Sequence, residues 1–460
     1  MTRMLQCISP IDGSVYAERP VLAPEAARAA VARARAAQKA WAARPLDERV
    51  ALVMAGVKRL GEINDEVTVE LAWMMGRPVR YGGEFRGVEE RSTYMASIAA
   101  EGLADIALED SDEYRRFIRR EPHGVLFVIA PWNYPYMTAI NSVVPGLIAG
   151  NSVILKHATQ TLLVGERMAQ CFHEAGVPED VFQNVFLDHE TTEALLGEGQ
   201  FDFVNFTGSV AAGARLERAA AGTFTPMGLE LGGKDPGYVM EDADLDAAVA
   251  TLMDAAMYNA GQCCCGIERI YVHESLFDRF VEGAVAFARA YKLGNPLDSA
   301  TTLGPMANRR FADLVRRQIA DAVAAGAVAH VETFPEDDGG TYLTPQVLTN
   351  VTHDMEVMRE ESFGPVVGIM PVKDDEEALA LMNDSPYGLT ASLWTSDPDR
   401  AERLGARIET GTVFMNRADY LDPGLCWTGC KNTGRGGSLS ILGYHNLTRP
   451  KSYHLKKVTK

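Results

Sequence analysis

Continuous apolar runs that alternate with helical segments are the strongest constraint on the fold of this 460-residue chain. Between residues 124 and 222 the sequence reads GVLFVIA, MTAINSVVPGLIAG, SVILK, TLLVGERMAQCFHEAG, FDFVNFTGS and VAAGARLERAAAG, in that order. Strands that lack polar alternation are buried on both faces, and strands that alternate with helices form parallel sheets. We therefore expect a parallel sheet covered by helices on both faces, with ligands at the carboxyl ends of its strands.

A second run of the same kind occupies the other half of the chain. IERIYV is typical of a buried strand, residues 276–291 and the segment RRFADLVRRQIADAVAAGA of helices, and PVVGIMPV of another strand. A chain of this length exceeds what one hydrophobic core usually supports. The expected fold class is α/β, with two doubly wound domains: a Rossmann-like cofactor domain and a catalytic domain.

Two further segments predict a small β element. DEYRRFIRREP, residues 112–122, alternates in the manner of an exposed hairpin arm, and the last residues, NLTRPKSYHLKKVTK, are basic and extended. Both are candidates for contacts between subunits. The glycine cluster TGRGGS, residues 433–438, is interpreted as a turn, because we expect no apolar helix to follow it.

The charge and cysteine content restrict the partners and the location. A formal net charge of −18 argues against nucleic acid and anionic membranes, which select basic patches. The longest apolar stretch, AINSVVPGLIAGNSVIL, is interrupted by polar residues and proline, and the first residues lack an apolar targeting segment. Seven cysteines without framework spacing indicate free thiols in a reducing compartment. We expect a cytoplasmic protein without a nucleic-acid or membrane partner.

Three adjacent cysteines, Cys263, Cys264 and Cys265, follow the segment NAGQ. Three consecutive residues cannot easily turn their sulfurs toward one tetrahedral metal, and no Cys or His pair at ligand spacing stands nearby, so no metal site is expected. A disulfide within the triplet would be strained. Buried thiols acting as small hydrophobes explain two of the three. The polar, glycine-bearing approach favours one reactive sulfur exposed in a cleft.

At these residues the sequence resembles the aldehyde dehydrogenase superfamily, in its non-phosphorylating NAD(P)-dependent branch. The family's cysteine stands two residues after a Gly-Gln pair, which here is Gly261 and Gln262 and identifies Cys264. The family's glutamate lies in a Glu-Leu-Gly-Gly-Lys run, which here supplies Glu230, 34 residues before Cys264. PWNYP, GNSVILK, FTGS and EESFGPV also occur in family order, and the resemblance runs from about Ser9 to the C-terminal arm.

The resemblance implies oxidation of an aldehyde to the free carboxylic acid with NAD or NADP. The Cys264 thiolate would attack the carbonyl carbon, and the side-chain amide of Asn133 with the Cys264 N–H would hold the oxyanion. Hydride transfer leaves a thioester, and Glu230 would activate the water that hydrolyses it. Family branches that pass the acyl group to coenzyme A tend to lack this glutamate, so Glu230 favours release of the acid.

The resemblance also assigns a cofactor-binding set: Trp132, Lys156, Thr159, Gly208, Ser209, Glu361 and Phe363. Gly208 and Ser209 stand at a helix N-terminus, where a pyrophosphate can approach backbone N–H groups, although the G-x-G-x-x-G fingerprint is absent there. Glu361 would hold the nicotinamide ribose, and Phe363 would pack near the ring.

Cofactor choice depends on the residue three positions after Lys156. NAD-preferring members often carry a glutamate there, which repels a 2′-phosphate, whereas this chain has Thr159. With Lys156 and His157 nearby and no repulsion, NADP should be tolerated as well as NAD.

By family position the substrate pocket comprises Tyr134, Asn141, Cys263, Cys265, Leu421 and Trp427. Asn141 stands where several members have a large aromatic residue, so the tunnel is expected to be more polar or roomier. Arg417 and Asp419 lie close to this wall in the sequence and are candidates to meet a carboxylate tail, as in succinate semialdehyde. The plainer interpretation is that they pair with each other or with the scaffold.

The resemblance divides the chain into an NAD(P)-binding domain of residues 1–110 and 123–230, a catalytic domain of residues 231–435, and a bridging element of residues 111–122 and 440–460. Such arms pair between subunits, so a homodimer or homotetramer is expected. Three alternatives stay open: an enzyme that uses coenzyme A or phosphate as acyl acceptor, an inactive aldehyde-binding member, and a thiol redox sensor that uses the triplet.

Overall fold

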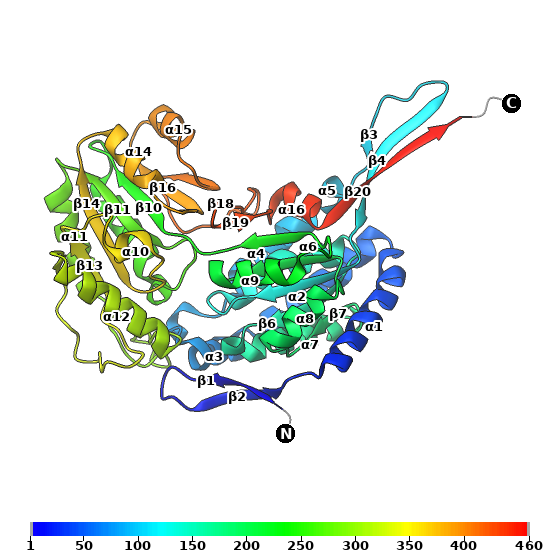
Figure 1. Ribbon diagram of the computed structural model, residues 1–460, viewed down its shortest axis with the longest axis horizontal. Helices are drawn as coiled ribbons and strands as arrows, with labels where there is room; N and C mark the ends of the chain where they lie inside the picture. Colours follow the sequence, from blue (N-terminus) through cyan, green and yellow to red (C-terminus); the bar gives the residue numbers. More distant parts are fainter. Residues whose placement is uncertain (1–2, 458–460) are drawn as a thin grey trace.

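A computed structural model describes residues 3–457 as two helix-covered sheets with a narrow β arm projecting from one of them (Figure 1). One sheet has six strands and the other seven, and most strands in each are parallel. The arm is a separate three-stranded sheet. The predicted fold class, two doubly wound α/β units and a small β element, is confirmed.

The six-stranded sheet has the order β19-β9-β8-β5-β6-β7. Its strands are β5 (Val125–Ala130), β6 (Ser152–His157), β7 (Phe182–Asn184), β8 (Phe203–Thr207), β9 (Met227–Glu230) and β19 (Gly434–Arg435). Residues of β5 alternate between two buried clusters: Val125, Phe127 and Ile129 face one, and Leu126, Val128 and Ala130 face the other. Because both faces of the strand are covered, the sequence shows an uninterrupted apolar run.

Helices form a layer on each face of this sheet. One layer contains α1 (Pro24–Ala42), α8 (His189–Gly197) and α9 (Val210–Ala220). The other contains α2 (Leu46–Glu62), α3 (Asn64–Met75), α6 (Pro135–Ile148) and α7 (Leu162–Glu174), with α4 (Phe85–Ser97) packed on α2 and α6. A short helix, α5 (Ala99–Gly102), leads from α4 toward the arm.

The strand order changes direction at β5. The chain adds β6 and β7 on one side of β5, then returns to add β8 and β9 on the other. In open parallel sheets, such a switch point leaves a crevice beyond the carboxyl ends of the two central strands, where ligands bind. Here those ends lead into Trp132–Asn133 and Gly208–Ser209.

The seven-stranded sheet has the order β12-β13-β14-β11-β10-β16-β17. Its strands are β10 (Asp235–Val239), β11 (Ile267–His273), β12 (Val328–Ala329), β13 (Gln346–Thr349), β14 (Val366–Val372), β16 (Thr390–Trp394) and β17 (Thr412–Met415). Helices α10 (Leu245–Met257) and α11 (Phe277–Arg289) cover one face, and α14 (Asp375–Asn383) and α15 (Pro398–Gly405) the other. Helix α12 (Arg309–Ala324) packs against α13 (Glu356–Arg359) and β12.

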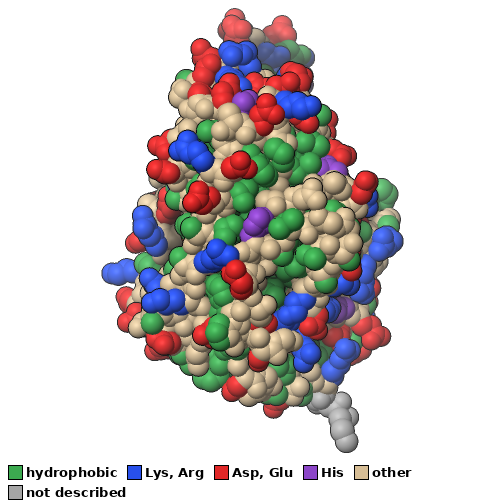
Figure 2. Space-filling model, turned by 90° about the vertical axis from the view of Figure 1, so that its left-hand side faces the viewer, with side chains coloured by type: hydrophobic (Ala, Val, Ile, Leu, Met, Phe, Trp, Pro, Cys, Tyr) green, Lys and Arg blue, Asp and Glu red, His purple; other side chains and the backbone are tan. Residues whose placement is uncertain are grey.

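The surface of this half carries many ion pairs. Figure 2 shows acidic and basic side chains interspersed over the face at the left of Figure 1. Arg317 on α12 pairs with Glu356 at 2.6 Å, and Arg400 on α15 pairs with Asp375 at 2.6 Å. Ion pairs that are well exposed, such as Arg317–Glu356, contribute only about 0–1 kcal/mol each, whereas Arg400 and Asp375 are part-buried.

The arm joins segments from distant parts of the chain. It contains β3 (Ile106–Ala107), β4 (Tyr114–Pro122) and β20 (Thr448–Lys456), and β20 runs antiparallel to β4 along its whole length. Phe117 stacks on Tyr453 with ring centroids 4.5 Å apart. The two segments predicted as one β element therefore pair with each other. Residues 1–2 and 458–460 of the predicted domain ranges lie outside the described residues, and the domain limits themselves stay a prediction.

The smaller elements include one correction. Hairpin β1 (Met4–Ile8) and β2 (Val15–Pro20) and the pair β15 (Tyr387–Gly388) and β18 (Cys430–Lys431) are short antiparallel ribbons. The glycine cluster interpreted as a turn instead contains strand β19, which pairs with β9, and helix α16 (Ser440–Asn446) follows it. No helix within residues 3–457 is both long and apolar enough to cross a membrane.

Candidate active site

One cavity of about 770 Å³ is lined by loops of both sheets and by α4 and α6. Every residue that the sequence assigns to catalysis, cofactor or substrate lines it: Trp132, Asn133, Tyr134, Asn141, Lys156, Thr159, Gly208, Ser209, Glu230, Cys263, Cys264, Cys265, Glu361, Phe363, Leu421 and Trp427. The structure thus brings the predicted residues together, while their individual roles stay predictions.

The segment before the cysteines has an unusual backbone. Asn259, Ala260 and Gly261 have positive φ values of 55°, 54° and 68°. A Cβ on Gly261 would lie 2.2 Å from the carbonyl oxygen of Gly364, so this position requires glycine. Left-handed conformations at non-glycine residues cost about 1–3 kcal/mol each and persist only where the surroundings hold them. The Asn259 amide does so by donating to the carbonyl of Asn133 at 3.2 Å.

This backbone presents Cys264 to the cavity and buries its neighbours. Cys263 is 4% exposed and Cys265 1%, whereas Cys264 is only partly buried. The Sγ atoms of Cys263 and Cys265 are 3.5 Å apart and donate to Asp419 Oδ1 at 3.1 and 3.0 Å. All three sulfurs lie within 4.8 Å of one another. The premise that three consecutive residues cannot turn their sulfurs to one point is therefore wrong here.

The neighbouring thiols change the acidity of Cys264. Hydrogen bonding by Cys263 and then Cys265 lowers the pKa of Cys264 to about 6, against the opposing effect of burial. Hydrogen bonds among the three thiols also raise the pKa of Cys263 and of Cys265. Cys264 is therefore the thiol of the three that ionises first, and a thiolate is the nucleophilic form of cysteine.

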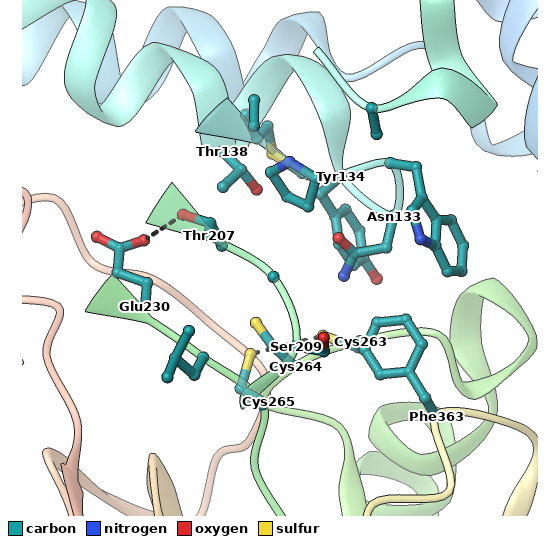
Figure 3. A pocket seen from close by; sticks show the side chains of 18 of the residues that line it. Asn133, Tyr134, Thr138, Thr207, Ser209, Glu230, Cys263, Cys264, Cys265 and Phe363 are labelled. Carbon is teal, nitrogen blue, oxygen red and sulfur yellow. Dashed lines mark hydrogen bonds between the residues drawn. The ribbon is translucent and has the colours of Figure 1, made fainter. Parts of the chain in front are cut away.

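Glu230 and Asn133 lie on opposite sides of Cys264 in Figure 3. Glu230 is the last residue of β9, and Thr207 at the end of β8 donates to its Oε2 at 3.2 Å. Burial raises the pKa of Glu230 above its ordinary value, and nearby hydroxyl groups oppose that shift. A carboxyl group with a raised pKa is a stronger base when ionised, which suits proton transfer near neutral pH.

Asn133 follows β5 and precedes α6, and its position is fixed through its backbone. Its carbonyl oxygen accepts from Arg77 at 2.6 Å, and Arg77 is itself paired with Glu84 in a buried ion pair of 2.6 Å. The Asn133 Nδ2 donates to the Gln262 carbonyl at 3.2 Å. Within residues 3–457 the N–H of Cys264 donates to no protein group. The two nitrogens are therefore suited to donate to an oxyanion formed at Cys264.

The glycine pair after Glu230 explains how Glu361 reaches the cavity. A Cβ on Gly232 would lie 2.3 Å from the Glu361 carboxylate, and the Gly233 N–H donates to Glu361 Oε1 at 3.1 Å. A Cβ on Gly233 would lie 2.8 Å from the carbonyl oxygen of Cys264. Burial raises the pKa of Glu361 to about 8. A side chain at position 232 would displace Glu361, and a side chain at position 233 would displace the backbone of Cys264.

Aromatic rings form the wall beside Glu361. Trp132 stacks on Phe311 with centroids 5.3 Å apart, and it meets Phe363 edge-on at 5.5 Å. Phe363 has a positive φ of 50°, so its backbone is strained at this point. Phe311 lies on α12 and was not predicted, because no motif marks it.

One end of the cavity lies at the crevice of the six-stranded sheet, where Gly208 and Ser209 line it. Ser209 caps α9 by accepting from the N–H of Ala212 at 3.3 Å, which turns the helix N-terminus toward the cavity. Burial lowers the pKa of Lys156 to about 8. A helix N-terminus, a lysine and an aromatic wall at a switch point fit a dinucleotide.

The sequence analysis expected His157 near the cofactor, but the histidine that lines this end of the cavity is His189. His157 points away from the cavity and contacts the Pro135 carbonyl at 3.2 Å, so it lies outside the lining residues. His189, the first residue of α8, lines the cavity instead. It follows the strand β7 in the next connection of the sheet, a position that a search of strand ends could have found.

Arg417 and Asp419 do not pair with each other. The Arg417 guanidinium is exposed and stacks on the Tyr420 ring at 3.5 Å from its centroid, outside the cavity lining. Asp419 lines the cavity and contacts the thiols. The expectation that Arg417 meets a substrate tail from this wall is therefore not supported.

Arg91 and Arg310 are cations that line the cavity and that the sequence interpretation missed, and Arg91 is the one on α4. It lies on α4, lines the cavity and donates to the carbonyl of Met137 at 3.0 Å and to Asn141 Oδ1 at 3.3 Å. Burial lowers its pKa, and it forms no ion pair within residues 3–457. Its position three residues after buried Val88 and four before buried Met95 marks an arginine on the buried face of a helix.

Comparison with known proteins gives a consistent picture. The family model described as "Aldehyde dehydrogenase family" matches residues 1–453. A succinate-semialdehyde dehydrogenase [NADP(+)] from Deinococcus radiodurans is 32% identical over 98% of this chain and 94% of the relative. The succinate semialdehyde dehydrogenase [NAD(P)+] Sad from Escherichia coli (strain K12) is 33% identical over 96% of this chain and 95% of the relative.

Solved structures agree with the sequence relatives. The crystal structure of an indole-3-acetaldehyde dehydrogenase in complex with NAD+ superimposes with a TM-score of 0.94 at 31% identity. The match covers 99% of this chain and 94% of the other.

Proposed function

Because the chain belongs to the aldehyde dehydrogenase family and oxidises aldehydes with NAD or NADP, we propose that Cys264, Glu230 and Asn133 carry out that reaction and release a free carboxylic acid. The support is that a thiol, a carboxyl group and two N–H donors meet at one cavity. The lowered pKa of Cys264 and the raised pKa of Glu230 agree with these roles.

The Cys264 thiolate attacks the carbonyl carbon, and the new C–S bond turns the carbonyl oxygen into an oxyanion. The Asn133 Nδ2 and the Cys264 N–H donate to that oxygen, as preorganised dipoles in a site with little water. Bound NAD or NADP supplies the acceptor for the hydride that leaves the former carbonyl carbon. Glu230 then takes a proton from water, the hydroxyl attacks the thioester, and the C–S bond breaks to give the acid and the Cys264 thiolate.

The cofactor is held by the seven residues assigned from the sequence: Trp132, Lys156, Thr159, Gly208, Ser209, Glu361 and Phe363. The N-terminus of α9 would hold the pyrophosphate, and Glu361, whose carboxylate accepts from the Gly233 N–H, would hold the ribose. Thr159 carries no negative charge, so both cofactors are accepted.

The substrate we propose is an aldehyde with a carboxylate tail, and succinate semialdehyde, named in two relatives, is the first to test. The proposal rests on the position and charge of Arg91. A partly buried guanidinium without an ion-pair partner loses solvation that a substrate carboxylate would replace, through charge-assisted hydrogen bonds. The neighbouring Asn141 leaves polar space beside it.

The test compares succinate semialdehyde with butanal, which has the same chain length and no charge. Arg91→Met should lower kcat/KM for succinate semialdehyde by about 10- to 100-fold, since a hydrogen bond to a charged group contributes about 1.5–3 kcal/mol. Activity with butanal should change little. Arg417→Met is the matched control, because that guanidinium lies outside the cavity. Equal loss on both aldehydes would reject Arg91 as the anchor.

The same assay without coenzyme A or phosphate separates the alternative acyl acceptors. Turnover without either compound supports release of the acid, whereas dependence on one of them would assign the other reaction. Loss of the aldehyde dehydrogenase activity on mild oxidation alone would not establish a sensor, because reactive thiols oxidise readily.

We also propose that the chain works in the cytoplasm as a homodimer or homotetramer, with the domain limits given from the sequence. The arm exposes apolar side chains, with Ile106 50% and Leu455 46% accessible, and an exposed apolar strand edge is a surface for pairing. Sedimentation equilibrium of the full chain and of Leu455→Asp tests this, since a charged residue there should shift the protein toward monomer.

A further inference from the structure

We propose that Cys263, Cys264, Cys265 and Asp419 form a binding site for one thiophilic divalent cation such as Zn²⁺, which competes with the aldehyde for Cys264. The binding itself follows from the arrangement of four donor atoms. Only its effect on activity rests on the proposed role of Cys264 as nucleophile.

The distances between the donor atoms suit such an ion. Zinc binds thiolate at about 2.3 Å and carboxylate oxygen at about 2.0–2.2 Å, so ligands at tetrahedral angles lie roughly 3.5–3.8 Å apart. Here the three sulfurs lie within 4.8 Å of one another, the Cys263 and Cys265 sulfurs are 3.5 Å apart, and Asp419 Oδ1 lies 3.1 and 3.0 Å from them. To coordinate one ion, the three sulfurs would approach one another by up to about 1 Å, and Asp419, which contacts two of them, would move toward Cys264 as the fourth ligand.

Within residues 3–457 the carboxylate of Asp419 has no cationic partner, which is a second observation in favour of a cation site. It has a positive φ of 48°, a strained conformation that directs it from the segment after β17 into the cavity wall. Within residues 3–457 its carboxylate is hydrogen-bonded only to the two thiols, which are weak donors. A cation would give the carboxylate the compensation that the protein does not supply.

The chemistry and the access also fit a soft cation. Thiolates select Zn²⁺ and related ions over Mg²⁺ or Ca²⁺, which prefer oxygen ligands. Cys264 is the most exposed of the three cysteines and opens to the cavity, so an ion can enter by the substrate's route. The Arg91 guanidinium, which lines the same cavity, offsets part of the negative charge of the ligands.

Binding has a defined proton balance. Each thiol that coordinates the ion loses its proton to water, and no electron is transferred. Because protons compete with the ion for the sulfurs, the affinity should rise as the pH rises. The ion occupies the sulfur that an aldehyde must reach, so the inhibition should be competitive with the aldehyde.

The first experiment measures binding without using activity. The full-length protein, reduced and freed of metal, is titrated with Zn²⁺ by calorimetry and with Co²⁺ by absorbance. We expect one ion per chain and a sulfur-to-cobalt charge-transfer band with the intensity of three thiolates. No saturable binding, or a band typical of a single thiolate, would overturn the proposal.

The second experiment uses variants of the ligands and a matched control. Cys265→Ser and Asp419→Asn should each weaken Zn²⁺ binding by at least about tenfold, since even the loss of a supporting residue costs that much. Cys430→Ser is the control, because that thiol contacts the Glu409 carbonyl outside the cavity and should leave the affinity unchanged. Unchanged Zn²⁺ affinity in both ligand variants would show that Cys264 alone binds the ion and would reject the four-ligand site.

The two proposals fail in distinguishable ways. Aldehyde oxidation that depends on Cys264, without stoichiometric metal binding, would reject only the cation site. Stoichiometric binding in a protein whose oxidation of aldehydes does not need Cys264 would reject only the catalytic assignment.

Discussion

The two large sheets contribute to the active site from opposite ends of their strands. In the six-stranded sheet the site residues follow the strands: Asn133 comes after β5 and Gly208 after β8. In the seven-stranded sheet they precede them: Cys264 comes before β11 and Glu361 before β14. The carboxyl-end rule for parallel sheets therefore describes the part of the site that the six-stranded sheet contributes, and not the part from the seven-stranded sheet.

This difference divides the chemistry between the two halves. Glu230, at the carboxyl end of β9, belongs to the six-stranded sheet, whereas Cys264 belongs to the loop before a strand of the seven-stranded sheet. The proposed base and the proposed nucleophile thus come from separate structural units that share one cavity. Four predictions test whether each unit has the role that its position indicates.

The largest effect should come from the seven-stranded half. Cys264→Ala should lower NAD(P)H formation by at least about four orders of magnitude, because no other thiol of the triplet faces the cavity with a lowered pKa. Cys263→Ala and Cys265→Ala should mainly change substrate preference, as measured by kcat/KM across a panel of aldehydes. Equal loss in all three variants would show that the triplet acts as a unit.

The six-stranded half should control the second chemical step. In Glu230→Gln, attack and hydride transfer should still occur once, but hydrolysis should slow by about 10²- to 10⁴-fold, the usual contribution of a positioned base. Rapid mixing should give a burst of NADH, and mass spectrometry should find the acyl group on Cys264. Normal steady-state turnover would remove Glu230 from the mechanism.

The pH dependence should report the thiol cluster. Cys264 must be ionised to attack, so kcat/KM should fall as the pH drops through about 6, the lowered pKa of that thiol. In Cys265→Ala, one hydrogen-bond partner is lost while Cys263 remains, so the acid limb should move up toward the ordinary thiol pKa of 9.0. An acid limb that stays at the same pH in this variant would assign it to another group, such as Glu230.

The smallest effect concerns the cofactor crevice alone. Thr159→Glu adds a negative charge beside Lys156 in the wall of the cavity, and it should raise KM for NADP by about tenfold, or roughly 1.4 kcal/mol. KM for NAD should change much less, because NAD lacks the 2′-phosphate. Thr159→Gln, with similar size and no charge, is the control and should leave the NADP to NAD ratio near that of the parent protein.

The sequence predicted the residues whose position depends on local backbone. Gly261, Gly232 and Gly233 stand where a side chain would collide with a neighbouring segment, so short motifs are required there and can be recognised. The apolar runs of the strands were equally informative, since burial on both faces leaves few residue choices.

The residues that escaped prediction reach the cavity through long-range packing. Arg91 lines the cavity because α4 packs on α6, and Phe311 because α12 places it against Trp132. No local pattern marks such contacts. The convergence of the three sulfurs likewise depends on the left-handed backbone before them, which composition does not reveal.

The pairing of β19 with β9 has a consequence for how the protein is made. Gly434 lies opposite Glu230, so the strand that ends in the proposed base has its outer edge covered only by a segment near the end of the chain. During synthesis the N-terminal parts of a protein fold first. A ribosome that stops after residue 430 would therefore release a chain with the strands of the dinucleotide crevice but with an open sheet edge beside the base, which invites aggregation and degradation. Synthesis of residues 434–435 is therefore needed before the edge of β9, which ends in Glu230, is covered.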